Sequence, residues 1–223
     1  MCGRFAFYSP TEATAALFGV RSVPEVKPRY NIAPTQTIAA VRVSAEDSRE
    51  LALLRWGLVP FWATDPSIGN RMINARAETV AEKPSFRAAY RKRRCLILAD
   101  GFYEWRKEAD GKTPYYITLA SGEPFGFAGL WEDWHSKDTG EALQTTAIIT
   151  TAANEFMTQI HHRMPVVLQK DAADRWLDGD EQLLAEVGES GPVFRAWPVD
   201  RRVNNARNEG EDLLKAAGDT VSA

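Results

Sequence analysis

Short runs of apolar residues, separated by polar turns, dominate the pattern of this chain and predict β-strands. Two of these runs, residues 38–43 and 51–56, flank a polar turn and are expected to pair as a hairpin. Further strands are predicted at residues 95–99, 115–119, 125–130, 144–151, 165–168 and 193–197.

Helical patterns are fewer and shorter. Ser9 is a predicted N-cap, Pro10 stands at the first helical position and Glu12 at the third, which predicts a capped helix ending near Phe18. Other helices are predicted at residues 85–91, 154–159, 171–177 and 181–187. Because the helices do not alternate regularly with the strands, a parallel sheet is disfavoured, and we expect an α+β fold with a mixed, mainly antiparallel β core flanked by short helices.

Length and composition place the chain among single-domain globular proteins. It has 223 residues, no linker and no internal repeat, so we expect one domain over residues 1–223. No apolar stretch is long enough to span a membrane and no secretory signal is present, which predicts an intracellular protein. Cys95 lies in an apolar run and is expected to be a buried, inert thiol, so a disulfide framework is disfavoured. The histidines and cysteines lack zinc-site spacing, and no metal or cofactor is predicted.

The charge is unevenly distributed. The net charge is −3, but residues 71–94 contain eight basic and two acidic residues, an excess of six positive charges. Such a chain can present a basic face to phosphate while it stays acidic overall. For residues 91–94 alone, a solvated helix face is an equally good interpretation.

The most reactive group that the sequence predicts is the amino terminus. Met1 precedes Cys2, and a small second residue permits removal of the initiator methionine. The product is a 1,2-aminothiol whose amine and thiol have ordinary pKa values of about 7.7–8.0 and about 8.5. An aldehyde can form an imine with this amine, and the thiol can then close a thiazolidine ring. Taken alone, Cys2 is better interpreted as an N-terminal residue of no function.

Loops dense in polar side chains supply partners for such a site. In residues 74–78, Asn74, Arg76 and Glu78 would face one way if the segment is extended. Residues 100–105 place Glu104 among aromatic residues, where loss of solvent favours the protonated acid that proton transfer requires. A rim carboxylate paired with arginine is the competing interpretation of Glu104.

Two further segments are weaker signals. His161, His162 and Arg163 could bind phosphate and transfer protons, although histidine pairs also occur in ordinary surface loops. Residues 56–62 carry aromatic side chains that can stack on bases. We expect Trp56 in the core and Trp62 exposed. Residues 27–36, with prolines at 28 and 34, predict a fixed, extended loop.

Together these segments resemble the SOS response-associated peptidase (SRAP) family, whose members crosslink themselves to abasic sites in single-stranded DNA. The resemblance spans Cys2 to about Leu214, and His162 stands at a position that we take to be variable. Six ordered motifs carry the match: Met1-Cys2-Gly3-Arg4, Tyr30-Asn31-Ile32-Ala33-Pro34-Thr35, Trp56-Gly57-Leu58-Val59-Pro60, Asn74-Ala75-Arg76-Ala77-Glu78-Thr79, Asp100-Gly101-Phe102-Tyr103-Glu104-Trp105 and His161-His162-Arg163-Met164-Pro165.

The resemblance implies a fold, a chemistry and a set of site residues. The fold is a barrel-like SRAP core, and the reaction is a thiazolidine link between Cys2 and the ring-opened sugar, with Glu104 as acid/base. His161 would assist at the sugar or phosphate and in reversal, and Asn74 would orient the Cys2 end. DNA contacts would come from Arg4, Trp62, Arg76, Thr150 and Arg163. The implied partner is single-stranded DNA with abasic sites, bound by a cytoplasmic monomer at the nucleoid or replication fork, without cofactor, metal or membrane.

Two alternatives stay open at this point. The first is a cysteine peptidase with an N-terminal nucleophile, in which a thiolate would act beside a base such as His161. Such a peptidase could act only to remove Met1. The second is a non-catalytic single-strand binding module, whose affinity would depend on salt and not on the lesion.

Overall fold

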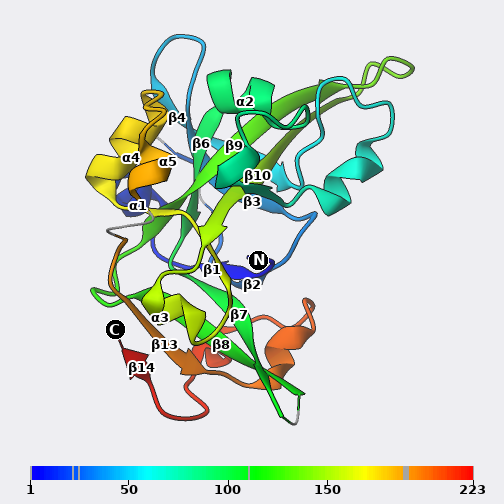
Figure 1. Cartoon of the computed structure of the whole chain (residues 1–223). Helices are drawn as coiled ribbons and strands as arrows, with labels where there is room; N and C mark the ends of the chain where they lie inside the picture. The colour runs from blue at the N-terminus through cyan, green and yellow to red at the C-terminus, as the bar shows by residue number, and fades with distance from the viewer. Residues whose placement is uncertain (1, 22, 25, 110, 188–190, 223) are drawn as a thin grey trace.

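Two β-sheets are present in the structure, a computed structural model that describes residues 2–21, 23–24, 26–109, 111–187 and 191–222 (Figure 1). The first sheet has the strand order β14-β13-β8-β7-β1-β2, and its paired strands are antiparallel. Its strands are β1 (Phe5–Phe7), β2 (Arg29–Ile32), β7 (Gly101–Glu108), β8 (Gly111–Leu119), β13 (Phe194–Pro198) and β14 (Val221–Ser222).

The second sheet closes on itself. Strands β3, β4, β10, β9 and β6 form a ring in which each pairs with the next and β6 returns to β3. The β10 pairings with β4 and β5 are parallel, while the other pairings are antiparallel. This closed barrel confirms the predicted mixed, mainly antiparallel, barrel-like core. The strands of this sheet are β3 (Thr37–Val43), β4 (Arg49–Trp56), β5 (Asn74–Arg76), β6 (Arg94–Ala99), β9 (Phe125–His135), β10 (Ala142–Ala152), β11 (Arg163–Pro165) and β12 (Val167–Leu168).

An aromatic cluster joins the two sheets. Phe5 of β1 meets the Trp56 ring at 5.2 Å and the Phe127 ring at 5.7 Å between centroids, both in edge-on arrangements. Phe102 of β7 packs on Phe127 in the same way, at 6.0 Å. All four side chains are fully buried. Because edge-on aromatic contacts fix orientation as well as distance, they fix the position of β1, which begins three residues after Cys2.

The helices are short and lie around the sheets (Figure 1). Every predicted helix is confirmed within a few residues: α1 (Thr11–Leu17), α2 (Arg87–Lys92), α3 (Glu155–Thr158), α4 (Lys170–Leu177) and α5 (Leu183–Glu186). None of the helices that the described residues form has the length and hydrophobicity to cross a bilayer. Four 3-10 helices complete the elements: η1 (Pro66–Arg71), η2 (Ala77–Thr79), η3 (Arg201–Asn204) and η4 (Glu211–Leu214).

The predicted cap of the first helix is wrong. Pro10 is the N-cap of α1, and no side chain caps the helix. The Ser9 hydroxyl donates instead to Asp100 Oδ1, and Asp100 Oδ2 accepts the backbone N–H groups of Tyr8 at 2.6 Å and Ser9 at 2.8 Å. A charged acceptor that takes three hydrogen bonds competes successfully with a single cap contact.

Three segments interpreted as loops contain strands. Residues 27–36 include β2, and residues 74–78 run from β5 into η2, so Glu78 does not continue the extended face of Asn74 and Arg76. Residues 101–108 form β7, which lies between β8 and β1. Gly101 is required there, because a Cβ atom would lie 2.4 Å from the Tyr116 ring of the neighbouring strand.

Candidate active site

Cys2 lies inside the protein, next to Asn74. The Cys2 side chain is fully buried, and its Sγ lies 3.9 Å from the backbone oxygen of Arg4. Asn74 Nδ2 donates to the Cys2 carbonyl at 2.8 Å. Asn74 belongs to β5, which pairs with β10 in the second sheet. The segment before β1 is thus tied to the second sheet through one of its predicted site residues; Met1 lies outside the described residues.

Glu104 enters the site from β7. The Tyr103 N–H donates to the Arg4 carbonyl at 2.9 Å, which continues the β1–β7 pairing towards the amino terminus and brings the next residue, Glu104, alongside Cys2. Only 3% of Glu104 is exposed. Burial and, after it, the Glu104 carboxylate raise the pKa of the Cys2 thiol above its ordinary value. The Cys2 thiol is therefore neutral at physiological pH.

Slow alkylation of Cys2 is the expected result of this environment. Because the pKa is raised, the thiolate fraction is small and rises tenfold per pH unit, so the rate with iodoacetamide should climb through pH 9.5 without a plateau. At pH 7.5 we expect a rate at least about 100-fold below that of free cysteine. Peptide mapping by mass spectrometry separates Cys2 from Cys95, a buried thiol whose pKa is raised to about 12 by the same loss of solvent. A plateau near pH 8 at Cys2 would contradict this assignment.

The His161 ring is held by the backbone after it. Nδ1 lies 3.0 Å from the Arg163 nitrogen and 3.1 Å from the Arg163 oxygen. A neutral ring can accept the N–H, and a protonated ring can donate to the C=O, so both protonation states have a partner. The exposed His162 ring stacks on His161 at 4.3 Å, and its pKa is lowered mainly by His161. The Glu104 charge acts on His162 in the opposite direction, in agreement with a place near the same site.

Arg163 and Thr150 form an internal brace. The buried Arg163 guanidinium binds both Glu78 oxygens, at 2.5 and 3.0 Å, and Nη2 donates to the Thr150 carbonyl at 2.8 Å. The fully buried Thr150 hydroxyl donates to Ala75 O at 3.4 Å. These contacts connect η2, β10 and β11 beside Asn74. The structure thus places both residues in a protein network, and their contact with DNA stays a prediction.

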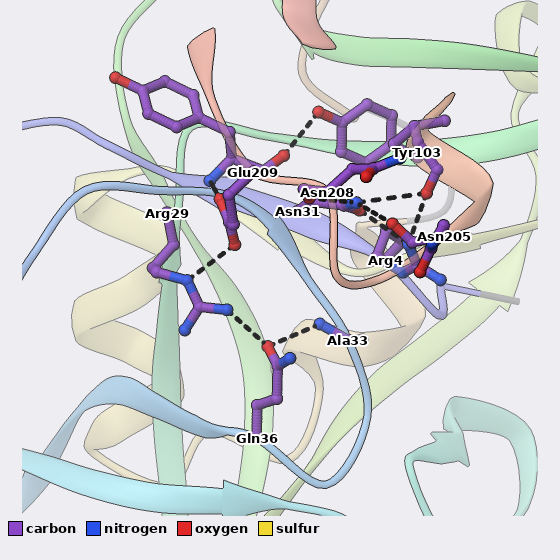
Figure 2. Close-up of polar contacts among 11 residues, drawn as sticks. Arg4, Arg29, Asn31, Ala33, Gln36, Tyr103, Asn205, Asn208 and Glu209 are labelled. Carbon is purple, nitrogen blue, oxygen red and sulfur yellow. Dashed lines mark hydrogen bonds and ion pairs between the residues drawn. The ribbon is translucent and has the colours of Figure 1, made fainter. Parts of the chain in front are cut away.

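Arg4 is also engaged within the protein. Its Nη1 donates to Asn31 Oδ1 at 2.7 Å and to Val203 O at 2.6 Å (Figure 2). The side chain is half-buried, and this loss of solvent lowers its pKa. Asn31 was not predicted as a site residue, although it lies within one of the six motifs. The available signal was a polar residue between Tyr30 and Ile32 in a segment predicted as an extended loop; in the structure this segment contains β2, and Asn31 is buried.

Arg76 and Trp62 face solvent. Arg76, at the end of β5, is exposed and forms no ion pair with a described residue. Trp62 is 44% exposed beside Phe61, which is 56% exposed, whereas Trp56 is fully buried, as predicted for both tryptophans. No group of three or more His, Cys, Asp or Glu side chains within the described ranges could hold a metal ion. Cys2, Asn74, Glu104 and His161 thus gather near the amino terminus, with Arg76 and Trp62 exposed on the surface.

Comparisons with known proteins agree on one family. The SOS response associated peptidase (SRAP) family matches residues 1–206. The chain is 43% identical to the abasic site processing protein YoaM of Bacillus subtilis (strain 168), over 97% of this chain and 98% of the relative. It is 33% identical to the abasic site processing protein YedK of Escherichia coli (strain K12), over 96% and 99%. A crystal structure of a Bacteroides thetaiotaomicron protein superposes with a TM-score of 0.85 at 28% identity, covering 97% of this chain and all of that one. The resemblance carried by the six motifs is thereby confirmed, and the chain belongs to the SOS response associated peptidase family.

Proposed function

We propose that this protein processes abasic sites by linking itself covalently to them in single-stranded DNA, through a thiazolidine on Cys2. The observation that carries the proposal is the placement of Cys2 beside Asn74 and the buried Glu104. The names of the relatives, which are abasic site processing proteins, support the choice of substrate.

The reaction needs only the aminothiol and an aldehyde. After removal of Met1, the Cys2 amine attacks C1 of the ring-opened sugar to give a carbinolamine, which loses water to form an imine. The thiol then adds to the imine carbon, a C–S bond forms, and the sulfur proton passes to nitrogen. The adduct therefore has the mass of protein plus DNA less one water. No oxidant or metal is consumed.

Neighbouring side chains fit roles in these steps. The Glu104 carboxylate can take a proton from the attacking amine and deliver it to the hydroxyl that leaves as water, and it can then carry the sulfur proton to nitrogen. Asn74 holds the Cys2 carbonyl at 2.8 Å and so orients the amine and thiol. His161 can hand on a proton at the sugar or phosphate and in reversal of the link. A thiol that stays neutral until the imine forms is oxidised more slowly than a thiolate.

The cysteine peptidase alternative is less well supported. A peptidase needs a thiolate, usually favoured by a cationic neighbour. Here burial and the Glu104 charge both raise the Cys2 pKa, which is the opposite arrangement. A non-catalytic binding module requires neither Glu104 nor Asn74 beside Cys2. It also predicts equal binding of intact and abasic strands.

Exposed cations offer a surface for the DNA backbone. Of the basic residues in 71–94, six are exposed: Arg71, Arg76, Lys83, Arg87, Arg91 and Lys92. Phe61, Arg91 and Lys92 line an open pocket of about 500 Å³, together with the acidic residues Glu132 and Asp133. Arg94 differs from these residues: it is buried and stacks on the Tyr90 and Trp176 rings at 4.5 and 4.4 Å. The exposed basic surface therefore excludes Arg94 and is smaller than the charge pattern of residues 71–94 predicts.

Substitution of Arg94 should mainly lower stability, whereas substitution of Arg91 should mainly weaken DNA binding. Arg94→Met removes donors to the carbonyls of Tyr90 and Asp180, at 2.9 and 2.7 Å, and should lower the free energy of unfolding in urea by about 2–3 kcal/mol. Arg91→Ala should change stability by less than about 0.5 kcal/mol but weaken single-strand binding and reduce the salt slope by about one. Equal effects of both variants on DNA binding would contradict this division.

The test of the proposal is an intact-mass measurement on the purified protein. A free mass that lacks methionine is expected, followed by an adduct of protein plus DNA less water when an oligonucleotide with one abasic site is added. The matched control is the same strand with the abasic sugar reduced to its alcohol, which has no aldehyde and should give no adduct. Retention of Met1, or an equal adduct with the reduced sugar, would rule out the thiazolidine.

A further inference from the structure

The Asn31 side chain connects the amino-terminal segment to a distant part of the chain (Figure 2). It is fully buried, and its Oδ1 accepts a hydrogen bond from Arg4 Nη1 at 2.7 Å. Its Nδ2 lies 3.3, 3.1 and 2.9 Å from the backbone oxygens of Val203, Asn205 and Asn208. An amide nitrogen has two hydrogens, so every donor of Asn31 is used on this segment.

Arg4 is fixed at both its side chain and its backbone. Nη1 also donates to Val203 O at 2.6 Å, so Asn31 and Val203 together use both hydrogens of this nitrogen. The Arg4 backbone oxygen accepts from the Tyr103 N–H at 2.9 Å and lies 3.9 Å from Cys2 Sγ. The same residue is therefore in contact with Asn31, with β7 and with the nucleophilic side chain.

Contacts outside Asn31 hold the distant segment in place. Glu209 Oε1 accepts from Arg29 Nε at 2.8 Å, and Oε2 accepts from the Tyr30 N–H at 2.9 Å. Arg29 Nη2 also donates to Gln36 Oε1 at 2.9 Å (Figure 2). Loss of the Asn31 side chain would thus leave the Arg4 side chain with the Val203 carbonyl as its remaining partner, while the segment keeps its attachment to β2.

We propose that Asn31 is a positioning residue for the covalent reaction: it fixes Arg4, and Arg4 places Cys2 opposite Glu104. This inference rests on the proposed function. Among the described residues, Asn31 hydrogen-bonds to Arg4 and not to Cys2, so its influence on Cys2 passes through Arg4. A displacement of about 1 Å in a reacting group can cost up to about 100-fold in rate, which makes the contact measurable.

The experiment compares single and double variants in single-turnover crosslinking to an abasic oligonucleotide. Asn31→Ala should lower the rate constant at saturating oligonucleotide about tenfold, with the half-saturating concentration changed by less than about twofold. Arg4→Met should lower the same rate constant by a similar factor. Because the two residues act in series, the double variant should be within about twofold of the slower single variant.

Two controls separate positioning from stability. Glu209→Gln weakens the anchor of the same segment without touching Arg4, and its rate should stay within about twofold of the unsubstituted protein. Asn31→Asp keeps an acceptor for Arg4 but loses the Nδ2 donors, so its rate should exceed that of Asn31→Ala. The thermal midpoint is measured for each variant. If Asn31→Ala does not fold, Asn31→Asp decides: a rate as low as that of Arg4→Met overturns the inference.

Three results would overturn the proposal in folded variants: an unchanged rate in Asn31→Ala, a change confined to the half-saturating concentration, or losses that multiply in the double variant. Absence of any adduct from the unsubstituted protein would instead refute the proposed function, so the two failures are distinguishable.

Discussion

Replacing Cys2 with alanine is expected to abolish the stable adduct with abasic single strands. The rate of stable adduct formation should fall by more than about 1,000-fold. The alanine variant keeps the α-amine and can still form an imine, but imines hydrolyse, and the ring cannot close without sulfur. The side chain is buried and its carbonyl is held by Asn74, so a smaller residue should leave that hydrogen bond in place. Denaturing gels and intact mass after quenching measure the stable product.

Cys2→Ser is the matched control for this loss. It keeps the size and hydrogen-bonding capacity of the side chain but replaces sulfur with a poorer nucleophile. We expect an adduct from either variant only when borohydride is present to reduce the imine. A stable, borohydride-independent adduct from Cys2→Ala would show that the link does not involve the thiol.

Glu104→Gln is expected to slow adduct formation by about 100- to 1,000-fold at saturating DNA, the range typical of loss of a general acid/base. The amide has the same shape but cannot transfer a proton at neutral pH. The same substitution removes the negative charge that raises the pKa of the Cys2 thiol, so the pKa should fall. Alkylation of Cys2 by iodoacetamide at pH 8 should therefore become faster while crosslinking becomes slower.

Faster alkylation of Cys2 together with slower crosslinking distinguishes loss of proton transfer from general damage to the site. A misfolded or loosened variant would lose crosslinking and also change its affinity for a strand with the reduced abasic sugar, which should be unchanged in Glu104→Gln. An unchanged crosslinking rate, with alkylation accelerated, would remove Glu104 from the acid/base role and leave it a purely electrostatic one.

The strands of the barrel could be predicted because their apolar runs are continuous. The hairpin of residues 38–43 and 51–56 is confirmed by the pairing of Ile38 with Leu54 and Val41 with Leu51. Strand β6, predicted at residues 95–99, is buried along its whole length and needs no alternation to be recognised. The turn between the hairpin strands is polar, which marks their ends.

Strand β7 could not be predicted, because its pattern follows function as well as packing. Asp100 and Gly101 resemble a turn, and Glu104 is a charged residue in a strand whose neighbours are buried. Gly101 is explained by the Tyr116 ring and the Ile117 carbonyl on the adjacent strand. A glycine is unusual inside a strand, and here its cause is a contact with another strand rather than the local sequence.

The candidate site was predictable in its residue types more than in its contacts. Asn74 and Glu104 were selected for their chemistry, and both lie beside Cys2. The pairing of Arg163 with Glu78 and the hydrogen bond of Asn31 to Asn208 join segments that meet only in the folded protein. Neither contact leaves a local pattern, since each partner alone is an ordinary polar residue.

Strand β10 sets a condition on how this protein reaches its native state. It borders β4, β5, β9 and β11, and Thr146 lies opposite Trp56 in parallel pairing. Such pairing between distant segments raises contact order and slows folding. During synthesis the barrel stays open until residues 142–152 have left the ribosome, and until then β4 and β9 each present an unpaired edge that can recruit another chain.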